Sequence, residues 1–98
     1  MSEITGAQRK YLKGMAHHLS PLVQIGKNGL TDAVVKSIDE ALDIHELIKV
    51  RMGDPEDKKG MADEIAQRTR SARVGLIGHI VILYRRQPDP EKRTIDLP

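Results

Sequence analysis

The segment "LVQIGKNGLTDAVVKSIDEAL", from Leu22 to Leu42, contains the residues whose spacing points most directly to chemistry. Gly26 and Gly29 enclose only Lys27 and Asn28, where a short apolar run gives way to a helix-like repeat. A four-residue loop there places backbone N–H groups beside a helix N-terminus, where unpaired donors and the helix dipole favour an anion. Glycines at both ends let a phosphodiester approach closely, and Lys27 adds a mobile positive charge. The motif predicts a phosphate-binding loop.

The chain carries a second GxxG pattern, "GLIG", from Gly75 to Gly78. Its inner residues are apolar and it leads into a β-branched run, so we interpret it as sheet and turn. A GxxG loop clamps the nucleic-acid backbone in KH-type domains. For Gly26 to Gly29, a tight turn with incidental glycines is an equal alternative on the loop alone.

The elements that must position this loop follow from hydrophobic periodicity and from turn residues. We expect a helix over about 7–19, a strand over 22–25 that is well buried, and a helix over 30–42 capped by Thr31 or Asn28. A strand over 46–52 and a helix that runs to about Thr69 follow, with Asp54 as N-cap and Pro55 at the first helical position. Two strands then lie within 73–86, with a turn near Gly78 and His79.

This order, α-β-α-β-α-β-β, predicts an α/β fold with a mixed four-stranded sheet and three helices. Ninety-eight residues suit one domain, over 1–98, with a core of about 6–86 and a proline-broken tail over 87–98. The first helix has a basic side with Arg9, Lys10 and Lys13, whereas Tyr11 falls in its apolar run and is expected in the core, as is Tyr84.

Composition and charge narrow the function further. The chain has no Cys, no apolar run long enough to span a bilayer and nothing like a signal peptide, so we expect a cytoplasmic protein that does not bind membranes. The formal net charge is only +2, but its distribution is uneven. Residues 30–46 hold one lysine and five carboxylates, whereas residues 68–93 hold seven bases and two acids. This segregation favours a basic surface patch.

Catalytic and cofactor motifs are missing from the sequence. There is no Walker loop, dinucleotide fingerprint or nucleophile elbow, and adjacent His17 and His18 do not present two rings to one metal. We therefore expect no enzyme, cofactor, metal or small-molecule substrate. With no Phe, no Trp and two Tyr, the chain lacks the stacking platforms of many proteins that bind single-stranded nucleic acid, so a nucleic-acid ligand would be recognised through its phosphates, sugars and shape.

Four segments give the chain a family resemblance: "YLKGMAHHLSPLVQIGKNGLT", "ALDIHELIKVRM", "LIGHIVILYRR" and the terminal "KRTIDLP". In this order and spacing they resemble the CRM domain, the chloroplast RNA splicing and ribosome maturation domain, in its single-domain bacterial YhbY-like form. The resemblance implies an RNA-binding domain with a KH-like GxxG loop. For bacterial stand-alone members it also implies association with precursors of the large ribosomal subunit. Residues 53–72 match the family least.

Two functions remain open at this point. In the first, the chain is a monomer that binds structured ribosomal RNA during ribosome assembly. Its RNA-binding residues are then Gly26, Lys27, Asn28 and Gly29 of the loop, extended by Arg9, Lys10 and Lys13 of the first helix. In the alternative, the chain is a protein-interaction module that docks on ribosomal or other assembly proteins through the acidic face of the second helix.

Overall fold

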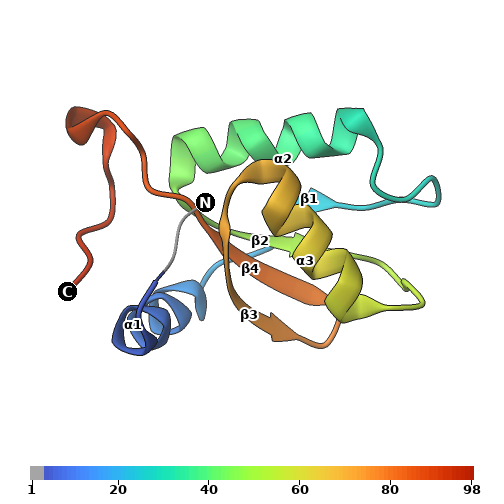
Figure 1. Cartoon of the computed structure of the whole chain (residues 1–98), viewed down its shortest axis with the longest axis horizontal. Coiled ribbons are helices and arrows are strands. Elements are labelled where there is room, and N and C mark those ends of the chain that lie inside the picture. The colour runs from blue at the N-terminus through green and yellow to red at the C-terminus, as the bar shows by residue number, and fades with distance from the viewer. Residues whose placement is uncertain (1–3) are drawn as a thin grey trace.

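The computed structural model describes residues 4–98 and has three helices around a four-stranded sheet (Figure 1). In chain order the elements are α1 (Gly6–Ala16), β1 (Val23–Gln24), α2 (Asp32–His45), β2 (Leu47–Arg51), α3 (Lys58–Thr69), β3 (Ala72–Ile77), β4 (Ile80–Tyr84) and a 3-10 turn, η1 (Pro90–Lys92). The predicted order of helices and strands is therefore confirmed.

The sheet is mixed, with strand order β1-β2-β4-β3. β1 and β2 are parallel, because α2 connects them, and β4 runs antiparallel to both β2 and β3. Helices α2 and α3 cover one face, and α1 with the C-terminal segment covers part of the other (Figure 1). The predicted turn lies between β3 and β4, where Gly78 has a φ of +58°.

Two cores result, one on each face of the sheet, and the alternation of side chains along β2 separates them. Ile48 and Val50 belong to the larger core under α2 and α3. Leu47 points the other way, into a smaller core with Leu12 of α1 and Ile95 of the tail. The tail is thus part of the folded body.

The predicted boundaries of several elements are wrong, and the second helix continues to His45 instead of ending at Leu42. The first helix ends at Ala16, because from His17 onward N–H groups bond three residues back, as Leu19 does to the carbonyl of Ala16 at 2.9 Å. The strand predicted over 22–25 contains only Val23 and Gln24, and Leu22 is 54% exposed. Only Ile25, at 3% exposed, is buried there as expected.

Helix α3 begins three residues later than a cap at Asp54 would place it. Gly53 takes a φ of +78° and turns the chain, so Asp54 and Pro55 lie in a loop. Asp57 is the N-cap instead, and its carboxylate accepts the N–H of Gly60 at 3.0 Å.

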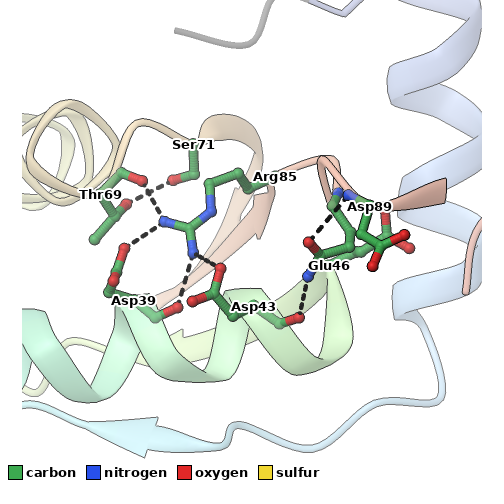
Figure 2. Close-up of polar contacts among 8 residues, drawn as sticks. Asp39, Asp43, Glu46, Thr69, Ser71, Arg85 and Asp89 are labelled. Atoms are coloured by element: carbon green, nitrogen blue, oxygen red, sulfur yellow. Dashed lines mark hydrogen bonds and ion pairs between the residues drawn. The ribbon is translucent and has the colours of Figure 1, made fainter. Parts of the chain in front are cut away.

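Arg85, which follows β4, ties the sheet to α2 and α3 (Figure 2). Its guanidinium donates to the carboxylates of Asp39 and Asp43, to the carbonyl of Asp39 and to the carbonyl of Thr69, the last at 2.8 Å. Thr69 also shares a buried hydrogen bond of 2.8 Å with Ser71. One arginine thus joins three elements behind the end of β4.

Glu46 holds the tail at the junction between α2 and β2. Its fully buried carboxylate accepts the backbone N–H groups of Gln87, Thr94 and Ile95. Burial alone would raise the pKa of Glu46, but these hydrogen bonds outweigh it and hold the pKa below 4.5. Burial, followed by the nearby Glu46 charge, raises the pKa of Tyr84.

Candidate nucleic-acid interface

The loop from Gly26 to Gly29 is a tight turn between β1 and α2. The N–H of Gly29 donates to the carbonyl of Gly26 at 3.0 Å, and this bond closes the turn. Lys27 and Asn28 form its exposed tip. Buried Ile25 anchors the loop before the turn, since its N–H donates to the carbonyl of Arg51 at 2.9 Å. The loop is therefore short, anchored and open to solvent at its tip.

The two glycines of the loop differ in what the backbone requires of them. Gly29 has a φ of +74°, a conformation that side chains with a Cβ disfavour. Gly26 has no such φ, and a Cβ added there would meet no other atom within 4 Å. Neither packing nor backbone conformation thus requires a glycine at position 26, and the space in front of it lies open to a ligand.

The N-terminus of α2 is already partly occupied. Thr31 caps the helix, and its hydroxyl accepts the N–H of Val34 at 3.2 Å. Asp32 occupies the first helical position and pairs at 2.9 Å with Arg68, which also donates to the carbonyl of Leu30 at 3.2 Å. Asp32 already places a carboxylate at the positive end of the helix. We therefore expect an anion to bind at the turn and not at the helix end itself.

A groove of about 470 Å³ separates the loop from the segment after β2. Gly26, Lys27 and Gly29 form one wall, and Asp54 and Pro55 lie on the other. Since the Asp54 carboxylate would repel a phosphate inside the groove, we expect the phosphate on the outer side of the turn.

The basic residues of α1 do not lie beside the loop. Figure 1 shows the loop at the right of the molecule and α1 at the lower left, against the sheet face opposite α2 and α3. Arg9 is partly buried and donates from Nη1 to the carbonyls of Arg73 and, at 3.2 Å, Val74. Lys10 and Lys13 are exposed. The structure thus separates α1 from the loop, and RNA contacts by these three bases stay a prediction.

One prediction about the tyrosines is wrong and the other is confirmed. Tyr84 is buried, at 2% exposed, but Tyr11 is 44% exposed. Leu12 and Ala16 face the sheet, so the helical rotation leaves Tyr11 and Met15 on the flank of α1. The spacing of apolar residues alone could not distinguish these two sides of the helix.

No role is predicted from the sequence for Lys49 and Arg51, two bases of β2. Arg51 pairs across the sheet with Gln24, two residues before Gly26. The alternation of apolar and basic residues in "LIKVR" was the signal, since it places both bases on one face of the strand.

The described part of the chain contains neither a metal-binding cluster nor a membrane-spanning helix. Within residues 4–98, no group of three or more His, Asp or Glu side chains lies close enough together to hold a metal ion. No helix in the described part of the chain has the length and apolar character needed to cross a membrane.

The geometry defines a class first: a small α/β domain with a mixed sheet and an exposed, glycine-bounded turn that leads into a helix. The family model for the CRS1 / YhbY (CRM) domain matches residues 4–85, and the chain belongs to this family. The family resemblance seen in the sequence is thus confirmed.

Proteins of similar sequence carry consistent names. A protein of Haemophilus influenzae named "RNA-binding protein" is 44% identical over 100% of this chain and 98% of its own length. YqeI of Bacillus subtilis, named a probable RNA-binding protein, is 40% identical over 97% of this chain and 99% of its own. The solution structure of SAV1595 from Staphylococcus aureus is 38% identical and superposes with a TM-score of 0.82, covering 98% of this chain and all of the other.

Proposed function

We propose that this chain is a non-enzymatic RNA-binding protein and that the turn from Gly26 to Gly29 seats an RNA phosphate. The observation that carries the proposal is that Gly26 faces open space, although neither packing nor backbone conformation requires a glycine there. The exposed side chains of Lys27 and of Arg51, which pairs with Gln24 two residues before Gly26, supply positive charge near the turn. The names of the two relatives support RNA as the ligand.

In this arrangement the phosphate contacts the backbone of the turn, and Lys27 neutralises its charge. Asn28 offers an amide that can donate to a phosphate or sugar oxygen. Such contacts recognise the backbone and not the base, so the turn alone gives affinity with little sequence preference.

The test is an RNA titration at several salt concentrations. Because each neutralised phosphate releases counterions, Lys27→Ala should weaken binding and lower the slope of log K against log[salt] by about 1. The melting temperature should stay unchanged, since Lys27 is exposed at the tip of the turn. An unchanged slope would remove Lys27 from the interface.

The RNA we propose is ribosomal, within precursors of the large subunit, and this step depends on the family resemblance. The test is co-sedimentation of the tagged chain with ribosomal particles from growing bacteria. We expect the chain in fractions of immature large subunits, and a variant with Lys27 and Asn28 both replaced by Asp should leave them. A parent chain found only in the unbound fraction would contradict the ribosomal role and leave RNA binding intact.

The alternative of an acidic docking face on α2 loses support from the side-chain contacts. Arg68 pairs with Asp32, and Arg85 pairs with Asp39 and Asp43. Glu46 is buried on backbone N–H groups. Of the five carboxylates, this leaves Glu40 as the one without a partner among residues 4–98, so α2 presents much less negative charge than its sequence indicates.

A further inference from the structure

Part of the sheet face beside α1 is uncovered. α1 and the tail cover the end of this face that holds Leu47 and Tyr84. Towards the Gly26–Gly29 turn the same face continues without a covering element. We call this part the open sheet face; it consists of Leu22, Gln24, Lys49, Arg51, Ile77 and Ile80.

Strand alternation and register place these side chains together. Lys49 and Arg51 alternate with buried Ile48 and Val50, so they point to the opposite face from the main core. Arg51 lies opposite Ile80 on β4 and beside Gln24 on β1. Directly paired residues share a face, with Cβ atoms about 5 Å apart.

The open sheet face carries positive charge only. Within the described structure, β1, β2, β3 and β4 contain no Asp or Glu, and Lys49 and Arg51 form no salt bridge. Lys13 of α1 adds a third base at the border, because its side chain reaches over Gly75 of β3. A phosphate chain therefore meets attraction along this face without a competing carboxylate from the strands.

Apolar side chains lie between these bases. Leu22 is 54% and Ile77 is 63% exposed, and Ile80 is half-buried. Exposed aliphatic groups in a basic surface can contact the faces of unstacked bases, which a duplex keeps hidden in its stack. The amide of Gln24 can both donate and accept hydrogen bonds at base edges.

The open sheet face also continues directly from the phosphate-binding turn. Gln24 is separated from Gly26 only by Ile25, whose N–H bonds the carbonyl of Arg51. We infer that the open sheet face binds an unpaired RNA segment that continues from the phosphate held at Gly26–Gly29. This inference rests on the proposed RNA-binding function and adds a second contact surface and a preference for unpaired strands.

The test compares a labelled unpaired oligoribonucleotide with a fully paired hairpin. In the double variant Lys49→Gln/Arg51→Gln, affinity for the oligonucleotide should fall about tenfold and its salt slope by about 1.4, for two lost phosphate contacts. The hairpin should be affected less. The matched control is Lys58→Gln/Lys59→Gln, which removes two exposed charges from α3 on the other face and should leave affinity for both RNAs unchanged.

Two further variants test the face without removing a charge. Leu22→Ser/Ile77→Ser should weaken binding of the oligonucleotide with no change of salt slope, because these residues contact bases. Gln24→Lys should strengthen binding of the oligonucleotide, whereas Gln67→Lys, at an exposed position of α3, should not. Because Gln24 is exposed, Gln24→Lys should keep the stability of the parent, so the expected gain in affinity tests the face even if another variant is destabilised.

The outcomes separate this inference from the proposed function. A parent chain that binds neither RNA would overturn both. Suppose that the parent binds RNA and Lys27→Ala weakens this binding, while Lys49→Gln/Arg51→Gln and Gln24→Lys bind like the parent. Then only the inference about the open sheet face is wrong. If Lys49→Gln/Arg51→Gln loses as much affinity for the hairpin as for the oligonucleotide, the preference for unpaired RNA is overturned.

Discussion

Gly26 and Gly29 bound the same turn, but only Gly29 has a backbone conformation that favours glycine. Its φ is +74°, whereas Gly26 has an ordinary conformation and faces open space. Sequence inspection could locate both glycines and not tell them apart, because the difference lies in one dihedral angle and in the emptiness around one atom. Glycine is favoured at position 29 by its backbone conformation, whereas at position 26 only the space in front of the residue accounts for it.

This difference gives a prediction for two alanine substitutions. Gly26→Ala should leave the free energy of unfolding within about 0.5 kcal/mol of the parent but weaken RNA binding, because the new methyl group occupies the space of the phosphate. Gly29→Ala should lower the free energy of unfolding by about 1 kcal/mol, because alanine disfavours the left-handed conformation. Denaturant unfolding and RNA titration measure both.

Gly14→Ala is the control, since Gly14 lies in α1 with open space around it. It should bind RNA like the parent and be more stable by about 1 kcal/mol, the helix-propensity difference. RNA binding by Gly26→Ala at parental strength would show that no phosphate approaches at this glycine.

Glu46 gives a prediction on pH. Its pKa is held below 4.5 in the folded chain by three backbone N–H donors, so its contribution to stability is full above that pH. It is lost as the pH falls through the folded pKa, because the carboxylate must then be protonated. Glu46→Gln should be less stable than the parent at neutral pH, and this difference should shrink below pH 4.5.

The measurement is a series of denaturant unfolding curves from neutral pH to below 4.5 for both proteins. A stability difference that stays constant over this range would show that the Glu46 carboxylate is not the group that couples the tail to pH. Glu40, which is exposed on α2, supplies the control, and Glu40→Gln should follow the parent.

At the scale of elements, periodicity predicted the order of helices and strands but not where several of them begin or end. The β3–β4 hairpin was predictable because Gly78 separates two β-branched runs. The cap of α3 was not, because Asp54 and Asp57 are both suitable N-cap residues and the turn at Gly53, with a φ of +78°, leaves Asp54 in a loop. The position of α1 relative to the loop depends on which face of the sheet the helix covers, which no local pattern encodes.

Arg85 carries the prediction that belongs to this scale. It joins β4 to α2 and α3 through two carboxylates and two carbonyls, and its side chain is 17% exposed. Arg85→Ala should lower the free energy of unfolding by about 2 to 3 kcal/mol, because charged hydrogen bonds are lost and polar groups are left unpaired.

Arg86 is the matched control, as the adjacent arginine with an exposed side chain. Arg86→Ala should change the free energy of unfolding by less than about 0.5 kcal/mol. Equal effects of the two substitutions would mean that the Arg85 contacts add no more than a general charge effect. Thermal or denaturant unfolding decides between these results.

At the scale of the whole molecule, a small net charge conceals two different sides. The carboxylates of α2 are largely paired with Arg68 and Arg85 or buried, while the strands on the open side carry bases alone. The sequence indicated this segregation as runs of charge but could not show which charges cancel. Lys27, Lys49 and Arg51 therefore remain to attract an anionic polymer, although the formal net charge is only +2.

The central claim is that the turn at Gly26–Gly29 seats an RNA phosphate, and one titration tests it most directly. RNA affinity is measured for the parent, for Lys27→Asp/Asn28→Asp, and for Lys36→Asp/Ser37→Asp, an exposed pair on α2 with the same change of charge. We predict that all three proteins fold and that the loop variant loses at least about tenfold in affinity, clearly more than the α2 variant, because its carboxylates lie where the phosphate binds. Equal affinity of the folded loop variant and the α2 variant would contradict the claim.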